Sequence, residues 1–237
     1  MKKILHIFLA IVVVLSISLA SLAFYGYVQF QRFSAQTGSL TTLVEQVENS
    51  DSYVEYHDLP NTLIRATVSI EDHRFFEHDG VDYIGLVRAI LSQINENLLK
   101  SGGSTITQQL AKNLYGQYDS NLSWKLAEFF FARELESHYS KSEIFALYVN
   151  VINYGNGYVG IKEASEGYFG KEPADLSDAQ CTILAGIPQV PNKYELTSTE
   201  NVQDAKERQK LVLDAMVEYK YLNQTQADEI YAESIWQ

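Results

Sequence analysis

The sequence predicts a mostly α-helical domain that follows one N-terminal membrane-spanning helix. Two observations support the helical part: apolar residues recur at helical spacing, and several stretches carry the residues that begin a helix. Strand signals are weak, and at most a short hairpin is expected around "NYGNGYVG", residues 153–160. The 237 residues suffice for a short anchor and one well-buried domain.

The membrane-spanning helix is expected over residues 4–25, which are almost wholly apolar and are followed by no charged residue before Arg32. Twenty helical residues span roughly 30 Å, the thickness of a bilayer's hydrocarbon core. The lysines within residues 1–3 predict a cytoplasmic tail there and place the rest of the chain outside the cell. A cleaved signal peptide is the alternative, because "SLASLAF" offers small residues to a peptidase, although the apolar run is long for one.

Residues 26–54 are polar and mixed, and we expect them to form a membrane-proximal stalk before a domain that covers residues 55–237. Within that domain, three stretches match the capping box, in which side chains at both ends satisfy unpaired amides at a helix start. They are residues 105–108, 140–143 and 177–180, and two further helices are expected over residues 201–220 and 226–235.

Composition excludes several classes of protein. The net charge is 18 − 30 = −12, which argues against a nucleic-acid partner. The single cysteine, Cys181, rules out an internal disulfide framework and is interpreted as a small core residue. The sequence contains neither a CxxC nor an HExxH pattern, so no zinc site is predicted. It also contains neither Ser-x-x-Lys nor Lys-Thr-Gly, the motifs that would indicate a penicillin-binding transpeptidase domain.

The stretch "SIEDHRFFEHDG", residues 69–80, crowds titratable groups around Phe75 and Phe76. A solvated turn needs no phenylalanines and a core needs no carboxylates, whereas a cleft that tunes one acid for chemistry needs both. Burial against apolar rings raises the pKa of a carboxyl group, which suits proton abstraction near neutral pH. Neighbours on a helix point in different directions, so we expect Glu71 to face the cleft and Asp72 to orient the loop. The alternative is that both are solvated charges at a helix end.

A second stretch, "SGGSTITQQLAKN" at residues 101–113, predicts a site for a phosphorylated carbohydrate. Its glycines allow the backbone to approach a ligand, and the following helix offers N-terminal amides to an anion. Gln108 and Lys112 share one helical face, with Gln109 and Asn113 beside them. Amides bind sugar hydroxyls, and a lysine binds phosphate. The alternative is a turn that precedes a polar helix surface.

A third stretch, "WKLAEFFFARELE", places Lys125 and Glu128 three residues apart on one helical face. Glu128 would form a functional pair with Glu71 if the fold brings them together, which the spacing alone does not decide.

Two of these motifs, EDxxFxxHxG at residues 71–80 and GGSTITQQxxKN at residues 102–113, resemble those of the peptidoglycan glycosyltransferases. This family includes the glycosyltransferase domain of class A penicillin-binding proteins. The agreement continues through "KSEIFALYVNVINYGNGYVGIKEASEGYFGK" and "LSDAQCTILAGIPQVPNKY", and covers about residues 55–235. The resemblance implies a monofunctional enzyme with a lysozyme-like, mostly α-helical fold and a membrane-associated jaw region beside the cleft.

The resemblance also implies an activity, which is to polymerise lipid II. The growing glycan on undecaprenyl pyrophosphate is joined to the 4-hydroxyl of a new acceptor, with inversion to a β-1,4 link and Glu71 as general base. Pyrophosphate leaves as a stable anion and needs positive charge, whereas a glycosidase must protonate its leaving group. Lys112 and Lys125 are the candidate cations, and a divalent cation, Mg²⁺ or Mn²⁺, near Glu128 is compatible with this chemistry without being required by it.

The resemblance assigns the site residues and the surroundings as follows. The catalytic residues are Glu71 and Glu128, and the substrate-binding residues are Asp72, Phe75, His78, Ser104, Thr105, Gln108, Gln109, Lys112, Asn113 and Lys125. The implied partners are lipid II, the growing strand and the membrane, and proteins of wall synthesis or division are compatible with them. The implied location is the bacterial cell membrane, crossed once.

The sequence departs from the family at three positions. Relatives commonly carry arginines where this chain has Ser120 and Trp124, and a glutamate where it has Gln180. Glutamine also completes a capping box, so Gln180 is interpreted as structural. The two missing cations motivate an alternative function, a catalytically weak relative that binds lipid II or a wall-synthesis partner. A lysozyme-like glycan-cleaving enzyme is the other alternative, and the "GGSTITQQ" phosphate site argues against it.

Overall fold

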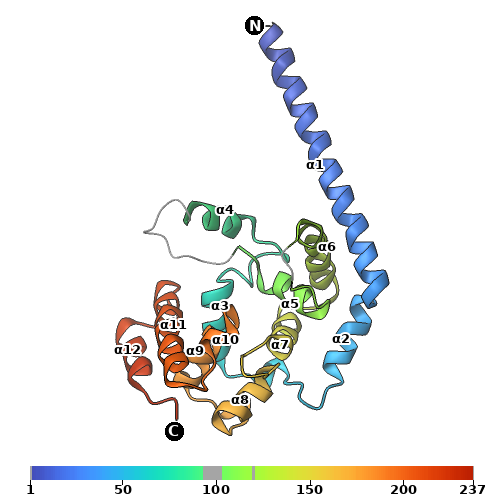
Figure 1. The fold of residues 1–237 in the computed structure, drawn as a ribbon. Coiled ribbons are helices and arrows are strands. Elements are labelled where there is room, and N and C mark those ends of the chain that lie inside the picture. The colour runs from blue at the N-terminus through green and yellow to red at the C-terminus, as the bar shows by residue number, and fades with distance from the viewer. Residues whose placement is uncertain (1, 93–102, 119–120, 237) are drawn as a thin grey trace.

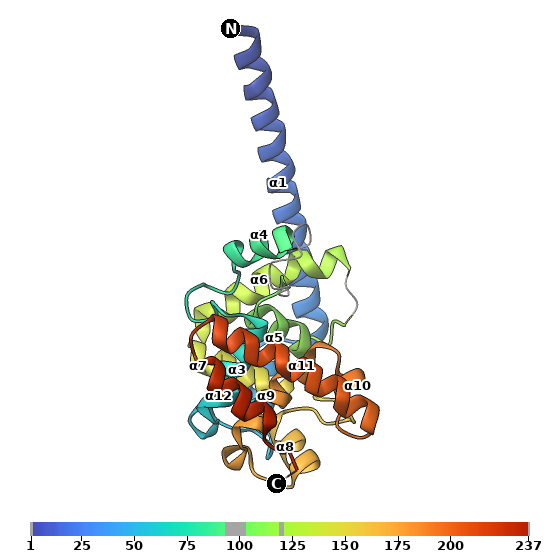
Figure 2. The same ribbon diagram turned by 90° about the vertical axis from the view of Figure 1, so that its left-hand side faces the viewer.

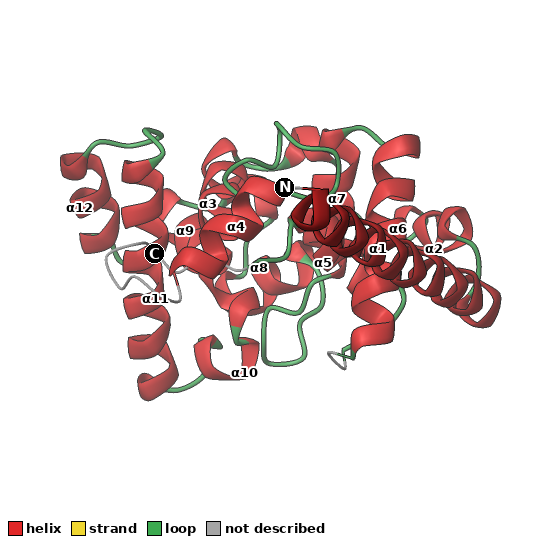
Figure 3. Ribbon diagram, turned by 90° about the horizontal axis from the view of Figure 1, so that it is seen from above, coloured by secondary structure: helices red, strands yellow, loops and turns green. Residues whose placement is uncertain are grey.

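The computed structural model describes residues 2–92, 103–118 and 121–236. These residues form helices joined by loops and contain no strand (Figure 3). The prediction of a mostly α-helical fold is therefore confirmed. In the region where a hairpin was expected, one isolated antiparallel bridge joins Asn153 and Val159.

The helices follow one another along the chain with short connections. They are α1 (Lys2–Thr37), α2 (Leu40–Glu48), α3 (Asn61–Glu71), α4 (Tyr83–Ser92), α5 (Ile106–Leu114), α6 (Leu122–His138), α7 (Lys141–Val151), α8 (Ile161–Phe169), α9 (Asp178–Gly186), α10 (Pro191–Tyr194), α11 (Thr199–Glu218) and α12 (Gln224–Ala232). Three short 3₁₀ turns are η1 (Tyr56–Asp58), η2 (Pro173–Asp175) and η3 (Ile187–Gln189).

The predicted helix starts are confirmed. Capping boxes are present at Thr105, Ser140 and Ser177, and a fourth, which the sequence analysis missed, is present at Asn223. The structural interpretation of Gln180 is also confirmed, because its buried side chain completes the box at the start of α9 and donates to the carbonyl of Ile235 at 2.9 Å. That second bond ties the end of the chain to α9.

The helices pack as two groups that share one core. Helices α3, α9 and α11 contact one another, while α5 packs against both α6 and α7 (Figure 1). Cys181 is buried in α9 as expected. The largest fully buried side chains are aromatic: Trp124, Tyr148, Tyr154, Phe75, Phe131 and Phe145. The three stretches expected to carry chemistry therefore each include part of a well-packed helix, which is α3, α5 or α6.

The region expected to be a stalk, residues 26–54, instead belongs to the folded body. Helix α1 runs without a break from the apolar segment to Thr37, and its second half packs along α6. Gly26 permits this close approach, since a Cβ there would lie 2.8 Å from the carbonyl oxygen of Leu126. Leu40 and Val44 of α2 are buried in the core. The polar composition of this region reflects its outer face, whereas apolar residues at helical spacing cover its inner face.

The first half of α1 projects from the body (Figures 1 and 2). Among the described residues, α1 is the single helix that is long and apolar enough to cross a membrane. Helix α4 lies at the end of the body from which α1 projects, and it exposes four large apolar side chains, Tyr83, Ile84, Leu86 and Val87. The apolar surface of α4 thus lies where the resemblance places a membrane-associated jaw.

Aromatic contacts join the second half of α1 to α6. Phe30 lies with its ring centroid 4.7 Å from that of Phe131, and Phe33 contacts Trp124 edge-on at 5.2 Å. Because apolar burial contributes about 25 cal/mol per Å², this contact is a substantial part of the stability of α6.

We therefore expect two N-terminal truncations to differ. Removal of residues 1–25 loses the hydrogen bond between Tyr25 and Ser123 but keeps the aromatic contacts of Phe30 and Phe33 with α6. Removal of residues 1–37 exposes the aromatic face of α6. The longer truncation should cost about 2–4 kcal/mol and lower the thermal midpoint by roughly 5–15 °C relative to the shorter one. Circular dichroism melts of both proteins in the same buffer test this, and equal midpoints would show that α1 merely tethers the domain.

Candidate functional site

Both glutamates singled out by the sequence line one cavity of about 300 Å³. Glu71 ends α3, and Glu128 projects from the first half of α6. The fold therefore brings together two carboxylates whose proximity the sequence could not establish. The lining residues are Glu71, Ser104, Gln109, Lys112, Gln117, Trp124, Lys125, Glu128, Pro188 and Gln189.

The carboxylate of Glu71 is held from two sides. Its Oε2 accepts a hydrogen bond of 2.9 Å from Nε2 of Gln109, and its Oε1 lies 3.6 Å from Nη2 of Arg208. The hydroxyl of Tyr148 donates to Oε1 of Gln109 at 3.3 Å, which turns the amide nitrogen toward Glu71. Burial raises the pKa of Tyr148 well above its ordinary value, so the phenol remains a donor.

Arg208 is a site residue that the sequence analysis missed. It lies on α11, its side chain is buried, and its Nη2 reaches Glu71 on a helix far away in sequence. Burial lowers the pKa of its guanidinium, and the neighbouring Glu71 carboxylate opposes that shift. A lone arginine within a polar helix does not indicate a site residue by sequence alone. Its position on the apolar side of α11 was the one available sign, because a buried arginine is usually paired with an acidic group.

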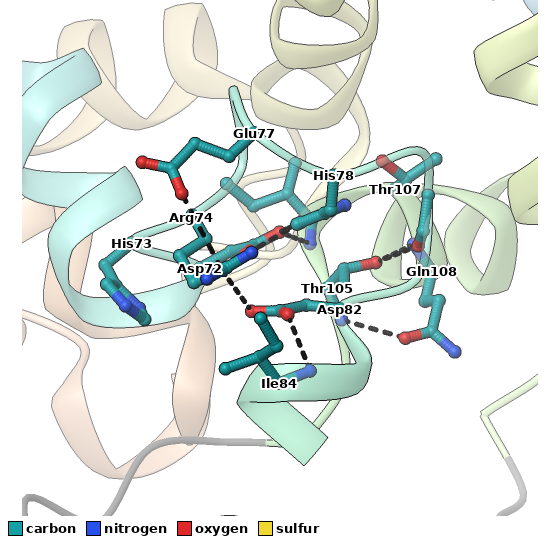
Figure 4. A network of polar contacts seen from close by, with 12 residues as sticks. Asp72, His73, Arg74, Glu77, His78, Asp82, Ile84, Thr105, Thr107 and Gln108 are labelled. Atoms are coloured by element: carbon teal, nitrogen blue, oxygen red, sulfur yellow. Dashed lines mark hydrogen bonds and ion pairs between the residues drawn. The ribbon is translucent and has the colours of Figure 1, made fainter. Parts of the chain in front are cut away.

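Asp72 organises the turn that follows α3 (Figure 4). Its carboxylate lies 3.0 Å from Nε2 of His78 through both oxygens, and it accepts a bond of 3.0 Å from the backbone amide of Ile106. The hydroxyl of Thr105 donates to the carbonyl of Gly80 at 2.6 Å. This geometry agrees with the loop-orienting role expected for Asp72.

The same contacts correct one expectation. The first amides of α5 were expected to offer an anion site, yet Asp72 and the Thr105 cap already accept from the amides of Ile106 and Gln108. A helix N-terminus attracts negative charge, and here the chain supplies its own carboxylate. The loop before α5, from residue 93 to Gly102, lies outside the described residues.

Of the remaining residues expected to bind substrate, several support the cavity from behind. Phe75 is fully buried under the ammonium of Lys141, which lies 4.5 Å from the ring centroid, and His78 is buried against Asp72. Gln108 completes the capping box of α5, and its Nε2 donates to Glu128 at 3.0 Å. None of these three is among the described residues that line the cavity.

Glu128 is 1% exposed and accepts hydrogen bonds from three side chains. Nζ of Lys125 lies 2.8 and 3.0 Å from its two oxygens, and Nε1 of Trp124 donates to Oε2 at 2.9 Å. Gln108 supplies the third donor. Nζ of Lys125 also donates to the hydroxyl of Ser104 at 3.0 Å, so this ammonium connects Glu128 of α6 to the residue that precedes the Thr105 cap.

The cavity adjoins a second one of about 270 Å³. Gln109 and Lys112 line both, as do Pro188 and Gln189 from η3. Asn113 lines the second cavity and donates to the carbonyl of Gln109 at 2.8 Å. The two adjoining cavities are therefore lined by two lysines, Lys112 in both and Lys125 in the first.

The described residues do not fit a divalent cation at Glu128. Both oxygens of this carboxylate already accept N–H donors, one of them the cationic Lys125. No group of three or more His, Cys, Asp or Glu side chains arranged to hold a metal occurs in the described part of the chain. A cation there would have to displace Lys125, so we derive no step through one.

The two positions where relatives carry arginine have different outcomes. Ser120 lies outside the described residues. Trp124 is buried within an aromatic cluster and provides an N–H donor to Glu128, so it contributes a neutral donor and no charge to the site.

Comparison with known proteins identifies clear relatives. A family model described as "Transglycosylase" matches residues 37–217. Penicillin-binding protein 2D of Bacillus subtilis is 41% identical over 183 residues, which are 77% of this chain and 26% of that protein. Penicillin-binding protein 1A of Streptococcus pneumoniae is 39% identical over 176 residues, 73% of this chain and 24% of that protein.

A third relative matches in length as well. It is a protein of Cupriavidus necator whose name describes it as a transglycosylase. The two chains are 34% identical over 228 residues, which are 96% of each chain. The chain thus spans about a quarter of the penicillin-binding relatives and nearly all of the Cupriavidus protein.

The pairing of Arg208 with Glu71 leads to a prediction. Arg208→Leu leaves a largely buried carboxylate without its cation, and should cost about 1–3 kcal/mol of unfolding free energy, while Arg208→Lys should cost less. Chemical denaturation measures both. Arg32→Leu on α1 is the control, because Arg32 is exposed and its removal should change stability by roughly 0.5 kcal/mol or less. A leucine variant at 208 as stable as that control would show that the ion pair contributes nothing.

Proposed function

Because this chain belongs to the transglycosylase family, we propose that it polymerises lipid II into β-1,4-linked glycan strands and releases undecaprenyl pyrophosphate. The observation that carries the proposal is the single cavity in which Glu71 meets Lys112 and Lys125. A base for an acceptor hydroxyl and cations for an anionic leaving group are the two requirements of this transfer.

In the proposed reaction, Glu71 accepts the proton of the acceptor's 4-hydroxyl as that oxygen attacks the anomeric carbon of the donor. The bond from that carbon to the pyrophosphate oxygen breaks with inversion, and the electron pair leaves with undecaprenyl pyrophosphate. Gln109 and Arg208 hold the carboxylate of Glu71 in one orientation during proton transfer. Lys112 and Lys125 stabilise the negative charge that develops on the leaving group.

The two adjoining cavities support a reaction between two saccharide units. The cavities of about 300 Å³ and 270 Å³ adjoin at Gln109 and Lys112, so each can take one partner with the reacting atoms between them. Holding both partners in line converts a bimolecular step into an effectively unimolecular one.

The surroundings of Glu128 argue against the glycan-cleaving alternative. A glycosidase requires a carboxylic acid that protonates the leaving oxygen. Both oxygens of Glu128 accept N–H donors, and a carboxylic acid would have to direct its O–H at one of them. This arrangement favours a carboxylate that orients Lys125 beside a pyrophosphate, which leaves without a proton.

We further propose that the chain crosses the bacterial cell membrane once, with residues 1–3 in the cytoplasm and the cleft outside. The apolar half of α1 and the exposed apolar side chains of α4 support a domain that lies on the extracytoplasmic surface of the cell membrane. A polyprenyl-linked substrate resides in that same surface, so the anchor raises its effective concentration. Wall-synthesis or division proteins are the partners that such a position would allow.

The direct test incubates the full chain in vesicles with labelled lipid II and resolves the products by size. Polymer supports the proposed function, cleavage of preformed glycan supports a hydrolase, and binding without turnover supports a weak relative that holds its substrate.

Glu71→Gln should lower turnover by about 10²–10⁴-fold, because glutamine keeps the size of the side chain but cannot accept a proton. The fold and lipid II binding should be retained, which thermal melts and a binding assay check. Glu77→Gln is the matched control, since Glu77 is an exposed glutamate in the turn that follows Glu71 and its variant should keep full turnover. A folded Glu71→Gln protein with normal turnover removes Glu71 from the mechanism.

Lys112→Ala should lose about 5- to 150-fold in turnover, whereas Lys112→Arg should retain most of it, because the proposed role requires a positive charge near pyrophosphate. Lys210→Ala on the exposed face of α11 controls for loss of a charge elsewhere. If the alanine and arginine variants at 112 turn over lipid II equally, the charge of Lys112 has no part in catalysis.

A further inference from the structure

The donors around Glu128 are of two kinds. Lys125 is 44% exposed at its side chain and reaches both the carboxylate and the hydroxyl of Ser104. Trp124 and Gln108, by contrast, are neutral and fixed in place. The indole of Trp124 is 1% exposed, and the amide of Gln108 is held by the capping box of α5. One donor is therefore free to move and two are not.

The mobile donor is also the one that substrate would attract. The ammonium of Lys125 lines the cavity, and a pyrophosphate there would compete with Glu128 for its N–H groups. If Lys125 turned toward the substrate, Glu128 would lose two of its four hydrogen bonds while remaining buried. A buried carboxylate without donors is strongly unfavourable, so the carboxylate needs other partners at that moment.

Trp124 is built to be such a partner. Its ring lies 5.4 Å from that of Phe131 in a stacked arrangement, and 5.2 Å from that of Phe33 edge-on. These contacts fix the indole, whose Nε1 donates to Oε2 of Glu128 at 2.9 Å. A donor locked by packing keeps its geometry when a neighbouring charge moves away.

We propose that Trp124 is a positioning residue, whose indole N–H holds the carboxylate of Glu128 while Lys125 transfers its hydrogen bonds to the pyrophosphate of the substrate. This inference rests on the proposed function, since it assigns Lys125 to the leaving group. Without the indole donor, Lys125 remains bound to Glu128, and the leaving group loses a cation in the transition state. The expected consequence is a fall in kcat, with little change in KM.

Three variants test the proposal in the full chain. Trp124→Phe keeps an aromatic ring but removes the N–H donor, and should lower kcat for lipid II by about 10- to 100-fold. Phe30→Ala loosens the contact between α1 and α6 but keeps Phe33 and Phe131 against the indole, and should lose stability while its kcat stays within about two-fold of the natural protein. Trp236→Phe replaces the other tryptophan, which is 56% exposed, and should leave kcat unchanged.

A measurement without turnover tests the contact itself. In the Trp236→Phe background Trp124 is the one indole left, so its Nε1–H gives a single resonance in ¹⁵N NMR spectra. Adding Glu128→Gln should move that resonance upfield, because a bond to a carboxylate is stronger than one to an amide. Inorganic pyrophosphate should leave the bond in place, with no loss of the downfield shift.

The outcomes separate the inference from the proposed function. Normal kcat in folded Trp124→Phe protein, equal losses in Trp124→Phe and Phe30→Ala, or an indole resonance indifferent to Glu128→Gln would each overturn the role of Trp124. If the natural chain makes no polymer, the proposed function fails and the catalytic role of Trp124 fails with it. The NMR result then still shows whether the indole binds Glu128.

Discussion

The site depends on the side-chain amides of two neighbouring residues of α5. They hold the carboxylates of Glu71 on α3 and Glu128 on α6, two helices that form walls of one cavity. Gln108 donates to Glu128 at 3.0 Å, and Gln109 donates to Glu71 at 2.9 Å. Neighbouring residues of an α-helix project about 100° apart, so one turn can reach both walls while the glutamates themselves stay separate. The start of α5 is in turn fixed by the Thr105 cap and by Asp72, which binds the amide of Ile106. A shift of α5 would therefore misalign both carboxylates together.

The second half of α1 extends this constraint toward the membrane. The unbroken helix carries the apolar segment at one end and packs along α6 at the other (Figure 1). Since α6 bears Lys125 and Glu128, the element that would lie in the bilayer contacts the same helix that forms one wall of the cavity. In the proposed topology, a rigid connection of this kind would set the orientation of the cleft above the membrane surface, which a flexible stalk would leave free.

Local signals made the helices predictable, and the same signals could not show the partners of the site. The capping boxes at Thr105, Ser140 and Ser177 depend on residues three apart, so sequence reveals them. The stalk prediction was wrong for residues 26–54, because a helix polar on its outer face resembles a linker when its partner is unknown. The pairing of Arg208 with Glu71 joins α11 to α3, and no pattern within either helix indicates it. The hydrogen bond from the indole of Trp124 to Glu128 joins residues one helical turn apart. In sequence, however, Trp124 was noticed only because relatives carry an arginine at its position.

A chain with a net charge of −12 can still serve an anionic substrate, because the relevant field is local. At physiological ionic strength the Debye length is about 8 Å, so exposed acidic groups on distant faces are largely screened at the cleft. Lys112 and Lys125 line the cavity itself, where a bound anion would lie within contact distance of them. Glu71 and Glu128 line the same cavity. Glu71 accepts a hydrogen bond from Gln109 and pairs with Arg208, while Glu128 accepts hydrogen bonds from Gln108, Trp124 and Lys125. Those bonds offset part of the carboxylate charge, so in the proposed reaction the lysines are the cations that an incoming pyrophosphate would meet. Under that proposal the side-chain amides of α5 would serve the leaving group as well as the base.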